Sequence, residues 1–162
     1  MIETGRFLFD RMLGSLCRRM RLLGFDSVII PESETGRFLI NAGRENRLAV
    51  TLATRESDRP GKPPLVLGSR ELDGQVLELL ECFREPPPLQ PFTRCLDCNS
   101  VLAEIGRDEA RGRVPDKITG IFSEFMECPR CRKVFWKGSH YEDMLKEVRE
   151  IESMLNNRKK GG

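Results

Sequence analysis

The chain has little of what several common enzyme classes need. Its 162 residues include one histidine, His140, so any Ser-His-Asp or Cys-His arrangement has to use that side chain. His140 stands where a helix is expected to begin, and a structural hydrogen bond is the more natural role there. A glycine-rich phosphate loop is also missing, because Gly61-Lys62 lacks the preceding glycine and the Ser/Thr of that motif. The sequence therefore gives little support for a histidine-dependent hydrolase or for a protein that hydrolyses ATP or GTP.

Neither the net charge nor the hydropathy of the chain points to a partner. The formal net charge is only +2, so local clusters of charge have to decide which molecules the protein binds. No apolar run approaches the length of a transmembrane helix, and the N-terminus lacks the apolar segment of a signal peptide. We therefore expect a cytoplasmic protein, in a reducing compartment, with no membrane association.

Four of the six cysteines form two Cys-x-x-Cys pairs, Cys95-Leu-Asp-Cys98 and Cys128-Pro-Arg-Cys131. Each pair offers two thiolates from one tight turn, and two such turns facing each other make a closed tetrahedral site, the geometry of structural zinc. We expect Zn²⁺ as a structural cofactor, with disulfides or iron as the alternatives. A closed site has no open position for substrate, so the activity has to lie elsewhere. Two further cysteines are expected to be buried free thiols on apolar helical faces, Cys17 and Cys82.

Segments typical of strands and helices alternate through the first half of the chain. Short apolar runs predict strands at 6–9, 27–30, 48–52 and 65–67, and helical periodicity predicts helices at 12–23, 34–45 and 72–83. This alternation predicts an α/β fold in which helices flank a parallel sheet. Such sheets bind ligands at the carboxyl ends of their strands, where Asp10 and the residues after Leu52 lie.

A proline-rich stretch divides the chain. Residues 85–91, Glu-Pro-Pro-Pro-Leu-Gln-Pro, favour extended polyproline geometry and predict a semi-rigid linker. We therefore expect an α/β domain over 1–84, a zinc module over 92–138 with short strands beside its cysteine turns, and a charged helix and tail over 139–162. The clearest strand of the zinc module is 134–136.

Candidate functional side chains gather near the first strand. Asp10 ends that strand, and its carboxylate can hold a divalent cation or cap the helix that begins beside it. Arg18 and Arg21 lie three residues apart on one helix face, where they either contact phosphate or form a solvated face. Further acids follow the later strands: Glu32, Glu34, Glu56 and Asp58.

The order of these residues resembles the Mut7-C ribonuclease domain family from about Phe7 to Met144. The first motif is Asp10-x-Met12-Leu13-Gly14-x-Leu16-x-Arg18-x-x-Arg21-x-Leu23-Gly24. The later motifs are Arg94-Cys95-x-x-Cys98-Asn99, Arg113-Val114-Pro115, Phe125-x-x-Cys128-Pro129-x-Cys131 and Phe135-Trp136-Lys137-Gly138-Ser139-His140. The resemblance implies a PIN-like nuclease domain followed by a zinc ribbon.

The resemblance also implies metal-dependent cleavage of RNA, in which carboxylates hold Mg²⁺ or Mn²⁺. Asp10 matches the first acid of the family, and Arg18 and Arg21 match helix arginines positioned to contact the RNA. The family usually has Leu-Thr-Arg-Asp after the third strand, whereas this chain has Val50-Thr51-Leu52-Ala53. Glu34 and Glu56 are the acids that we expect to complete the catalytic site.

Two alternatives to a ribonuclease stay open at this point. The absence of an acid at Ala53 favours a degraded PIN-like domain that binds RNA without cutting it. Basic side chains on the arginine-bearing helix and near the cysteine turns would then contact phosphate. A zinc ribbon or a charged C-terminal helix can also dock a protein partner, which would make the chain an interaction adaptor.

Overall fold

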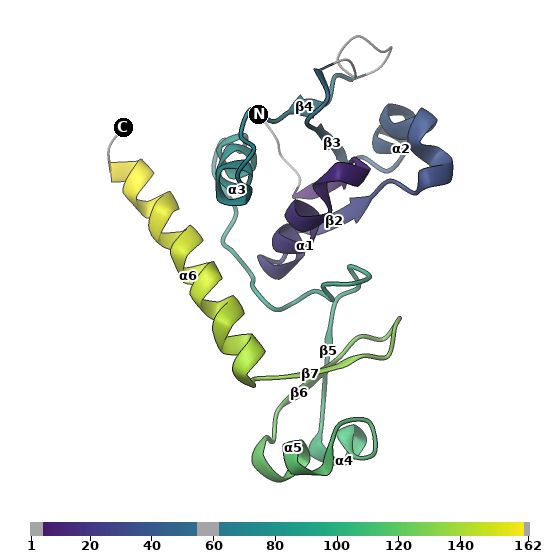
Figure 1. Ribbon diagram of the computed structural model, residues 1–162, viewed down its shortest axis with the longest axis vertical. Coiled ribbons are helices and arrows are strands. Elements are labelled where there is room, and N and C mark those ends of the chain that lie inside the picture. The colour runs from purple at the N-terminus through teal and green to yellow at the C-terminus, as the bar shows by residue number, and fades with distance from the viewer. Residues whose placement is uncertain (1–4, 55–61, 161–162) are drawn as a thin grey trace.

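The first half of the chain forms a four-stranded parallel sheet, as the computed structural model shows for residues 5–54 and 62–160 (Figure 1). Phe7 lies beside both Ser27 and Leu48, so the first strand is central and its neighbours run in the same direction. The prediction of a parallel sheet flanked by helices is confirmed. The strand order is β2-β1-β3-β4, with β1 at Arg6–Phe9, β2 at Asp26–Ile29, β3 at Leu48–Thr51 and β4 at Leu65–Val66.

Alternate side chains of the central strand supply two separate apolar cores. Phe7 and Phe9 face one side of the sheet, where α1 (Gly14–Leu22) and α3 (Leu72–Glu81) cover them. Leu8 faces the other side, which α2 (Phe38–Arg44) covers. Such burial on both faces explains why the strands read as continuous apolar runs.

The two predicted helices that follow β1 and β2 each begin with a 3-10 turn. The first turn, η1 (Arg11–Leu13), leads into α1, and the second, η2 (Glu32–Arg37), leads into α2. The Thr35 hydroxyl donates to the carbonyl of Glu32, a local bond that competes with regular helix formation. The segment predicted as one helix over 34–45 is therefore α-helical only in its second part.

The second half of the chain forms a three-stranded antiparallel sheet below the parallel one (Figure 1). Its core contains Ile105 and Phe125 from the strands and Ala110 and Val114 from the connection between them. The elements are β5 (Ala103–Ile105), α4 (Arg107–Ala110), α5 (Asp116–Ile121), β6 (Phe125–Glu127) and β7 (Val134–Trp136), in the sheet order β5-β6-β7.

The C-terminal helix α6 (Ser139–Lys160) begins where the sequence predicted and returns to the parallel-sheet unit. Val148 and Ile151 are 1% exposed and belong to the same core as α1 and α3. In Figure 1 this yellow helix rises from the antiparallel sheet toward α3. Its apolar stripe therefore joins the two halves of the chain. None of the described helices is both long and apolar enough to cross a membrane.

The proline-rich segment is docked against the end of α1. The backbone N–H of Gln90 donates to the Leu23 carbonyl (3.1 Å), and that of Phe92 donates to the Leu22 carbonyl (3.0 Å). Gly24 has a φ of +97°, and a Cβ at this position would lie 2.4 Å from the carbonyl oxygen of Gln90. Only glycine therefore allows both the turn that ends α1 and the close approach of residue 90.

The two cysteines outside the Cys-x-x-Cys pairs are free thiols. Cys17 is fully buried in α1, and its burial raises the pKa of the thiol to about 11. Cys82 is only half-buried because it lies at the end of α3, and burial raises its pKa as well. Both thiols are protonated at neutral pH.

Candidate functional site

The four cysteines of the two Cys-x-x-Cys pairs meet in one cluster. Their sulfur atoms all lie within 4.8 Å of one another, with 3.6 Å between Cys95 and Cys131 and 3.3 Å between Cys98 and Cys128. A tetrahedral zinc ion with Zn–S bonds of about 2.3 Å separates its sulfur ligands by about 3.8 Å. The donor set therefore fits Zn²⁺. In the described part of the chain, no other group of three or more histidine, cysteine or acidic side chains has this proximity.

The two cysteine turns have the same local geometry. In each turn the N–H of the first cysteine bonds to a carbonyl five residues later, at Ser100 (2.8 Å) and at Lys133 (2.9 Å). The residue after the second cysteine has a positive φ in both turns, 69° at Asn99 and 63° at Arg132. This repeated conformation aims both thiols of each turn at the same point.

The thiols differ in acidity. Burial raises the pKa of Cys95 to about 12. Burial also acts on Cys98, but hydrogen bonds from the backbone and hydroxyl of Ser100 and from neighbouring thiols outweigh it and lower the pKa to about 6. A bound cation favours the thiolate form of every cysteine that it contacts.

The first cysteine turn is mounted on the edge of the parallel sheet. The amide of Asn99 accepts from the N–H of Ser27 (2.9 Å) and donates to the carboxylate of Asp26 (2.7 Å). The guanidinium of Arg21 donates to the carbonyls of Leu96 (2.8 Å) and Asp97 (2.9 Å). The cysteine cluster and the parallel sheet therefore share one hydrogen-bond network.

The arginines of α1 are bonded within the protein. Arg21 is 8% exposed and donates to Ser27 as well as to the cysteine turn. Arg19 bridges Asp73 of α3 (3.2 Å) and Glu147 of α6 (3.1 Å). Arg18 is the most exposed of the three, with 58% of its side chain accessible, and it pairs with Asp97 at 2.8 Å. RNA contact by Arg18 and Arg21 stays a prediction.

Asp10 lies at the carboxyl edge of the sheet, between β1 and β3. One oxygen of its carboxylate accepts from the N–H of Met12 (2.8 Å), which caps η1. The other accepts from the hydroxyl of Thr51 and, at 3.4 Å, from the N–H of Leu52. These three donors fix the orientation of the carboxylate, so the cap and the positioned acid are the same feature.

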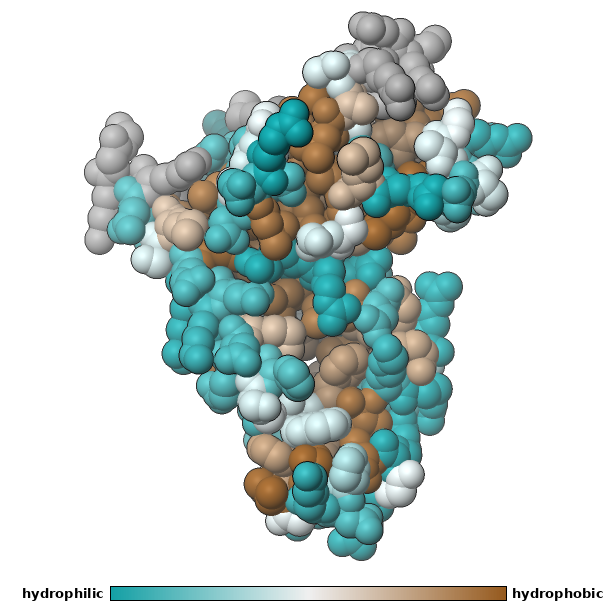
Figure 2. Space-filling model, viewed as in Figure 1, coloured by the Kyte–Doolittle hydropathy of each residue, from teal (hydrophilic) through white to brown (hydrophobic). Residues whose placement is uncertain are grey.

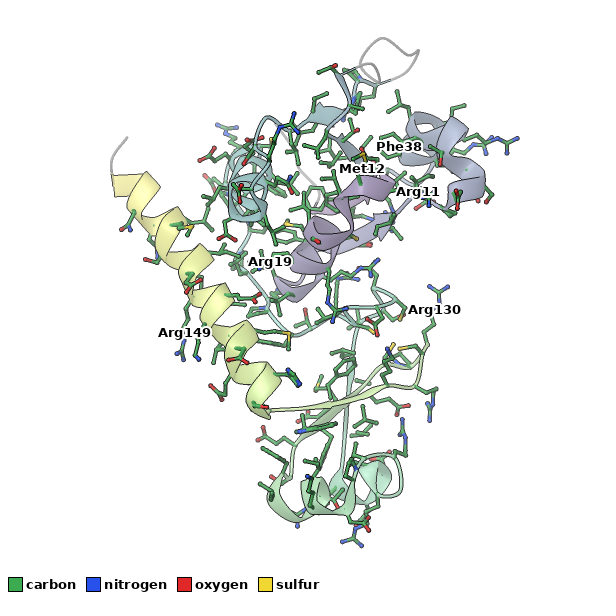
Figure 3. All side chains as sticks on the ribbon, viewed as in Figure 1. Arg11, Met12, Arg19, Phe38, Arg130 and Arg149 are labelled. Atoms are coloured by element: carbon green, nitrogen blue, oxygen red, sulfur yellow. The ribbon has the colours of Figure 1, made fainter. Side chains whose placement is uncertain are left out.

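The arginines and Asp10 lie toward opposite ends of α1. Figure 3 labels Arg11 and Met12 beside the η2–α2 segment and Arg19 at the other end of the helix, toward α6. Arg21 bonds to Ser27 near the start of β2, whereas Asp10 follows the end of β1. The cysteine cluster is therefore remote from the carboxyl edge of the sheet.

The two other acids expected in the catalytic site have different outcomes. Glu34 is exposed on η2 and accepts a hydrogen bond from the amide of Asn41 in α2. Glu56 and Asp58 lie outside the described residues. Glu32 pairs with Arg11 at 2.6 Å, so it lies near η1 at this same edge. The catalytic roles of Glu34 and Glu56 stay predictions.

The sequence analysis named two polar residues of the site without assigning them a role. Thr51 is fully buried, donates to Asp10 and accepts from the N–H of Ala53 (3.0 Å). In the sequence, Thr51 is marked only by being a hydroxyl residue in an otherwise apolar strand. That strand, β3, pairs with β1, the strand that Asp10 follows. Asn99 directly follows the first cysteine pair and has a positive φ, a conformation that asparagine adopts more readily than most residues. Its partners in β2 lie more than 70 residues away in sequence.

Comparisons with known proteins place the chain in a family. Neither curated proteins nor solved structures gave a match. The family model described as the Mut7-C RNAse domain matches residues 5–148, which include the Asp10 edge, both cysteine pairs and the first part of α6. The chain therefore belongs to the Mut7-C ribonuclease domain family.

Proposed function

We propose that the protein is a metal-dependent ribonuclease that cleaves RNA phosphodiester bonds at the Asp10 edge of the sheet. The observation that supports this most strongly is the match to the Mut7-C RNAse domain over residues 5–148. The position of Asp10 adds to it, because parallel sheets bind ligands at the carboxyl ends of their strands.

The contacts of Asp10 suit a preorganised metal ligand. Hydrogen bonds from the protein orient both carboxylate oxygens, and the oxygen that accepts from Met12 keeps a second lone pair for a further partner on this half-buried residue. Mg²⁺ is typically bound by one or two carboxylates together with waters and substrate phosphate oxygens. The cation, when bound, supplies an activated water and neutralises charge on the phosphate under attack.

Other residues of this edge have assigned roles in the proposal. Thr51 acts as a positioning residue because its hydroxyl holds one oxygen of Asp10. Glu34 and Glu56 are proposed as further acids that bind the cation directly or through water. Arg18 is proposed to contact the RNA backbone, exchanging its exposed partner Asp97 for phosphate.

We propose Zn²⁺ as the ion held by Cys95, Cys98, Cys128 and Cys131. Four thiolates close the tetrahedron, so this ion has a structural role. It would fix the first turn, which leads toward β5, and the second turn, which joins β6 to β7, and the Asn99 network extends that effect to β2.

A second candidate function is RNA binding without cleavage. It is favoured by the observation that, among the described residues, no cluster of three ligating side chains includes Asp10. The contacts of Asp10 with Met12 and Thr51 are also those of a purely structural cap.

The test uses zinc-loaded protein and end-labelled RNAs, both single-stranded and hairpin-containing, with Mg²⁺ or Mn²⁺. The ribonuclease proposal predicts cleavage that stops when the divalent cation is omitted while the zinc stays bound. Intact RNA together with salt-dependent binding would favour the second candidate. Intact RNA and no binding would exclude both and leave a protein-interaction adaptor, docking through the cysteine-bearing unit or α6.

A further inference from the structure

A groove of about 740 Å³ separates the antiparallel sheet from the first turns of α6. Figure 2 shows tan and brown residues in the hollow between the helix and the sheet, below the parallel-sheet unit. This volume is in the range of sites that bind small organic molecules or single segments of a polymer. The proposed ribonuclease chemistry at Asp10 does not use it.

The sheet presents one row of side chains to the groove, and all but Glu104 are apolar. Glu104 pairs with Met126, and Met126 pairs with Phe135, so these residues lie side by side across the three strands. Their neighbours Phe125 and Trp136 contact the core on the opposite face, and Trp136, which is only partly buried there, also borders the groove. Since alternate residues of a strand face opposite sides, Met126 and Phe135 are turned toward the groove that they line.

Aromatic rings also line the opposite wall and the rim. Tyr141 of α6 stacks on Phe92 with 4.3 Å between ring centroids and 35° between planes. Trp136, the only tryptophan of the chain, borders the groove where the chain turns into α6. A Cβ on Gly138 would lie 2.9 Å from the indole nitrogen of Trp136, so a glycine at 138 lets the ring lie over the backbone.

The polar groups of the groove carry both signs of charge. Lys137 pairs with Glu124, Glu104 is exposed, and Arg94 bonds to the carbonyls of Gly24 and Asn99. A site for phosphate alone would show an excess of cations. Apolar and aromatic walls with hydrogen-bond donors and acceptors at the edge suit a nucleobase, which has an apolar face and a polar edge of both kinds.

We propose that this groove binds unpaired bases of single-stranded RNA, which stack on the rings of Phe135 and Tyr141. The inference rests on the proposed function, from which RNA follows as the substrate class. The groove adjoins the cysteine-bearing unit, away from the carboxyl edge at Asp10, so it retains the RNA without contacting the reacting phosphate.

The first experiment uses the unmodified, zinc-loaded chain and the fluorescence of Trp136. Short oligouridylate and oligoadenylate are titrated at fixed ionic strength, without divalent cation to prevent cleavage. An abasic ribose-phosphate oligomer of equal length and charge is the matched probe. The groove proposal predicts that the base-containing oligomers change the emission of Trp136 and bind at least about fivefold more tightly than the abasic one.

Variants test the same contacts independently. Tyr141→Leu and Phe135→Leu keep apolar volume but remove the stacking rings, and each is expected to weaken RNA binding by at least about fivefold. In a cleavage assay they raise KM and leave kcat unchanged, because the groove does not contact the reacting atoms. Ile121→Ala is the control, since Ile121 is 70% exposed on α5 and does not line the groove.

The outcomes separate the groove from the ribonuclease proposal. RNA cleavage with equal affinity for abasic and normal oligomers, and with unchanged KM in both variants, would overturn the groove and leave the ribonuclease standing. No RNA binding at all would overturn both. Emission that responds to an amphipathic helical peptide but to no RNA would also overturn the proposal and assign the groove to a protein partner.

Discussion

Asn99 offers the sharpest test of how the cysteine cluster and the parallel sheet are joined. Its amide holds the buried N–H of Ser27 and the carboxylate of Asp26, while its backbone has a positive φ of 69°. Asn99→Ala removes both hydrogen bonds. It also leaves alanine in the left-handed region of φ, which asparagine adopts more readily than alanine. We expect the variant to have a lower free energy of unfolding, and we expect both halves of the chain to be destabilised.

The expected magnitude follows from three contributions. A hydrogen bond to a charged group is worth about 1.5–3 kcal/mol, and leaving the buried N–H of Ser27 unpaired costs about 1–3 kcal/mol. The left-handed backbone adds about 1 kcal/mol for alanine. Because these contributions overlap, we expect a total loss of about 3–5 kcal/mol, a large part of the stability of a typical domain.

The assay is urea unfolding of zinc-loaded protein, followed by circular dichroism and by Trp136 emission. Asn99→Gly keeps the backbone conformation and should lose about 1 kcal/mol less than Asn99→Ala. Asn46→Ala is the matched control, because Asn46 is exposed and has a φ of 50°. If Asn99→Ala cost no more than Asn46→Ala, the proposed coupling between the cysteine turn and the sheet would be refuted.

Three further predictions concern the metal, one turn and pH. Cys128→Ser should lose Zn²⁺ and the folded antiparallel sheet together, which metal analysis and circular dichroism measure; a fully metallated, folded variant would contradict the four-cysteine assignment. Gly24→Ala should destabilise the protein by at least about 1 kcal/mol, from its positive φ and the clash with Gln90, and an unchanged urea midpoint would contradict this. Although burial opposes it, hydrogen bonding by Arg47 and Asn99 lowers the pKa of Asp26 below its ordinary value of 3.8. The stability that Asp26 contributes is therefore complete above that pH and is lost as pH falls below it. Asp26→Asn should flatten this acid dependence, and equal acid slopes in the two proteins would contradict the assignment.

The sequence predicted those features that depend on local patterns. Periodicity located the strands and helices because one buried face repeats along each element. The two Cys-x-x-Cys pairs predicted the cluster because their spacing alone places two thiols on one turn. The start of α6 at Ser139 was also correct.

Contacts between distant segments could not be predicted in this way. Arg21 has the sequence context of a surface arginine, yet it is only 8% exposed. The backbone carbonyls of Leu96 and Asp97 accept hydrogen bonds from its guanidinium group. The partners of Asn99 and Thr51 likewise depend on which strands become neighbours. Fold-level packing, rather than local preference, sets the roles of these polar side chains.

The proposed ribonuclease activity is tested most directly by the cleavage rate of Asp10→Asn in Mn²⁺, at equal zinc content. Asparagine is a good helix cap and keeps an acceptor for the N–H of Met12, so the fold should persist while the charged metal ligand is lost. Asp108→Asn is the matched control, since the Asp108 side chain is 88% exposed on α4. The account predicts that Asp10→Asn abolishes cleavage and that Asp108→Asn leaves it unchanged. A folded Asp10→Asn protein that cleaves RNA at the native rate would contradict a catalytic site at Asp10.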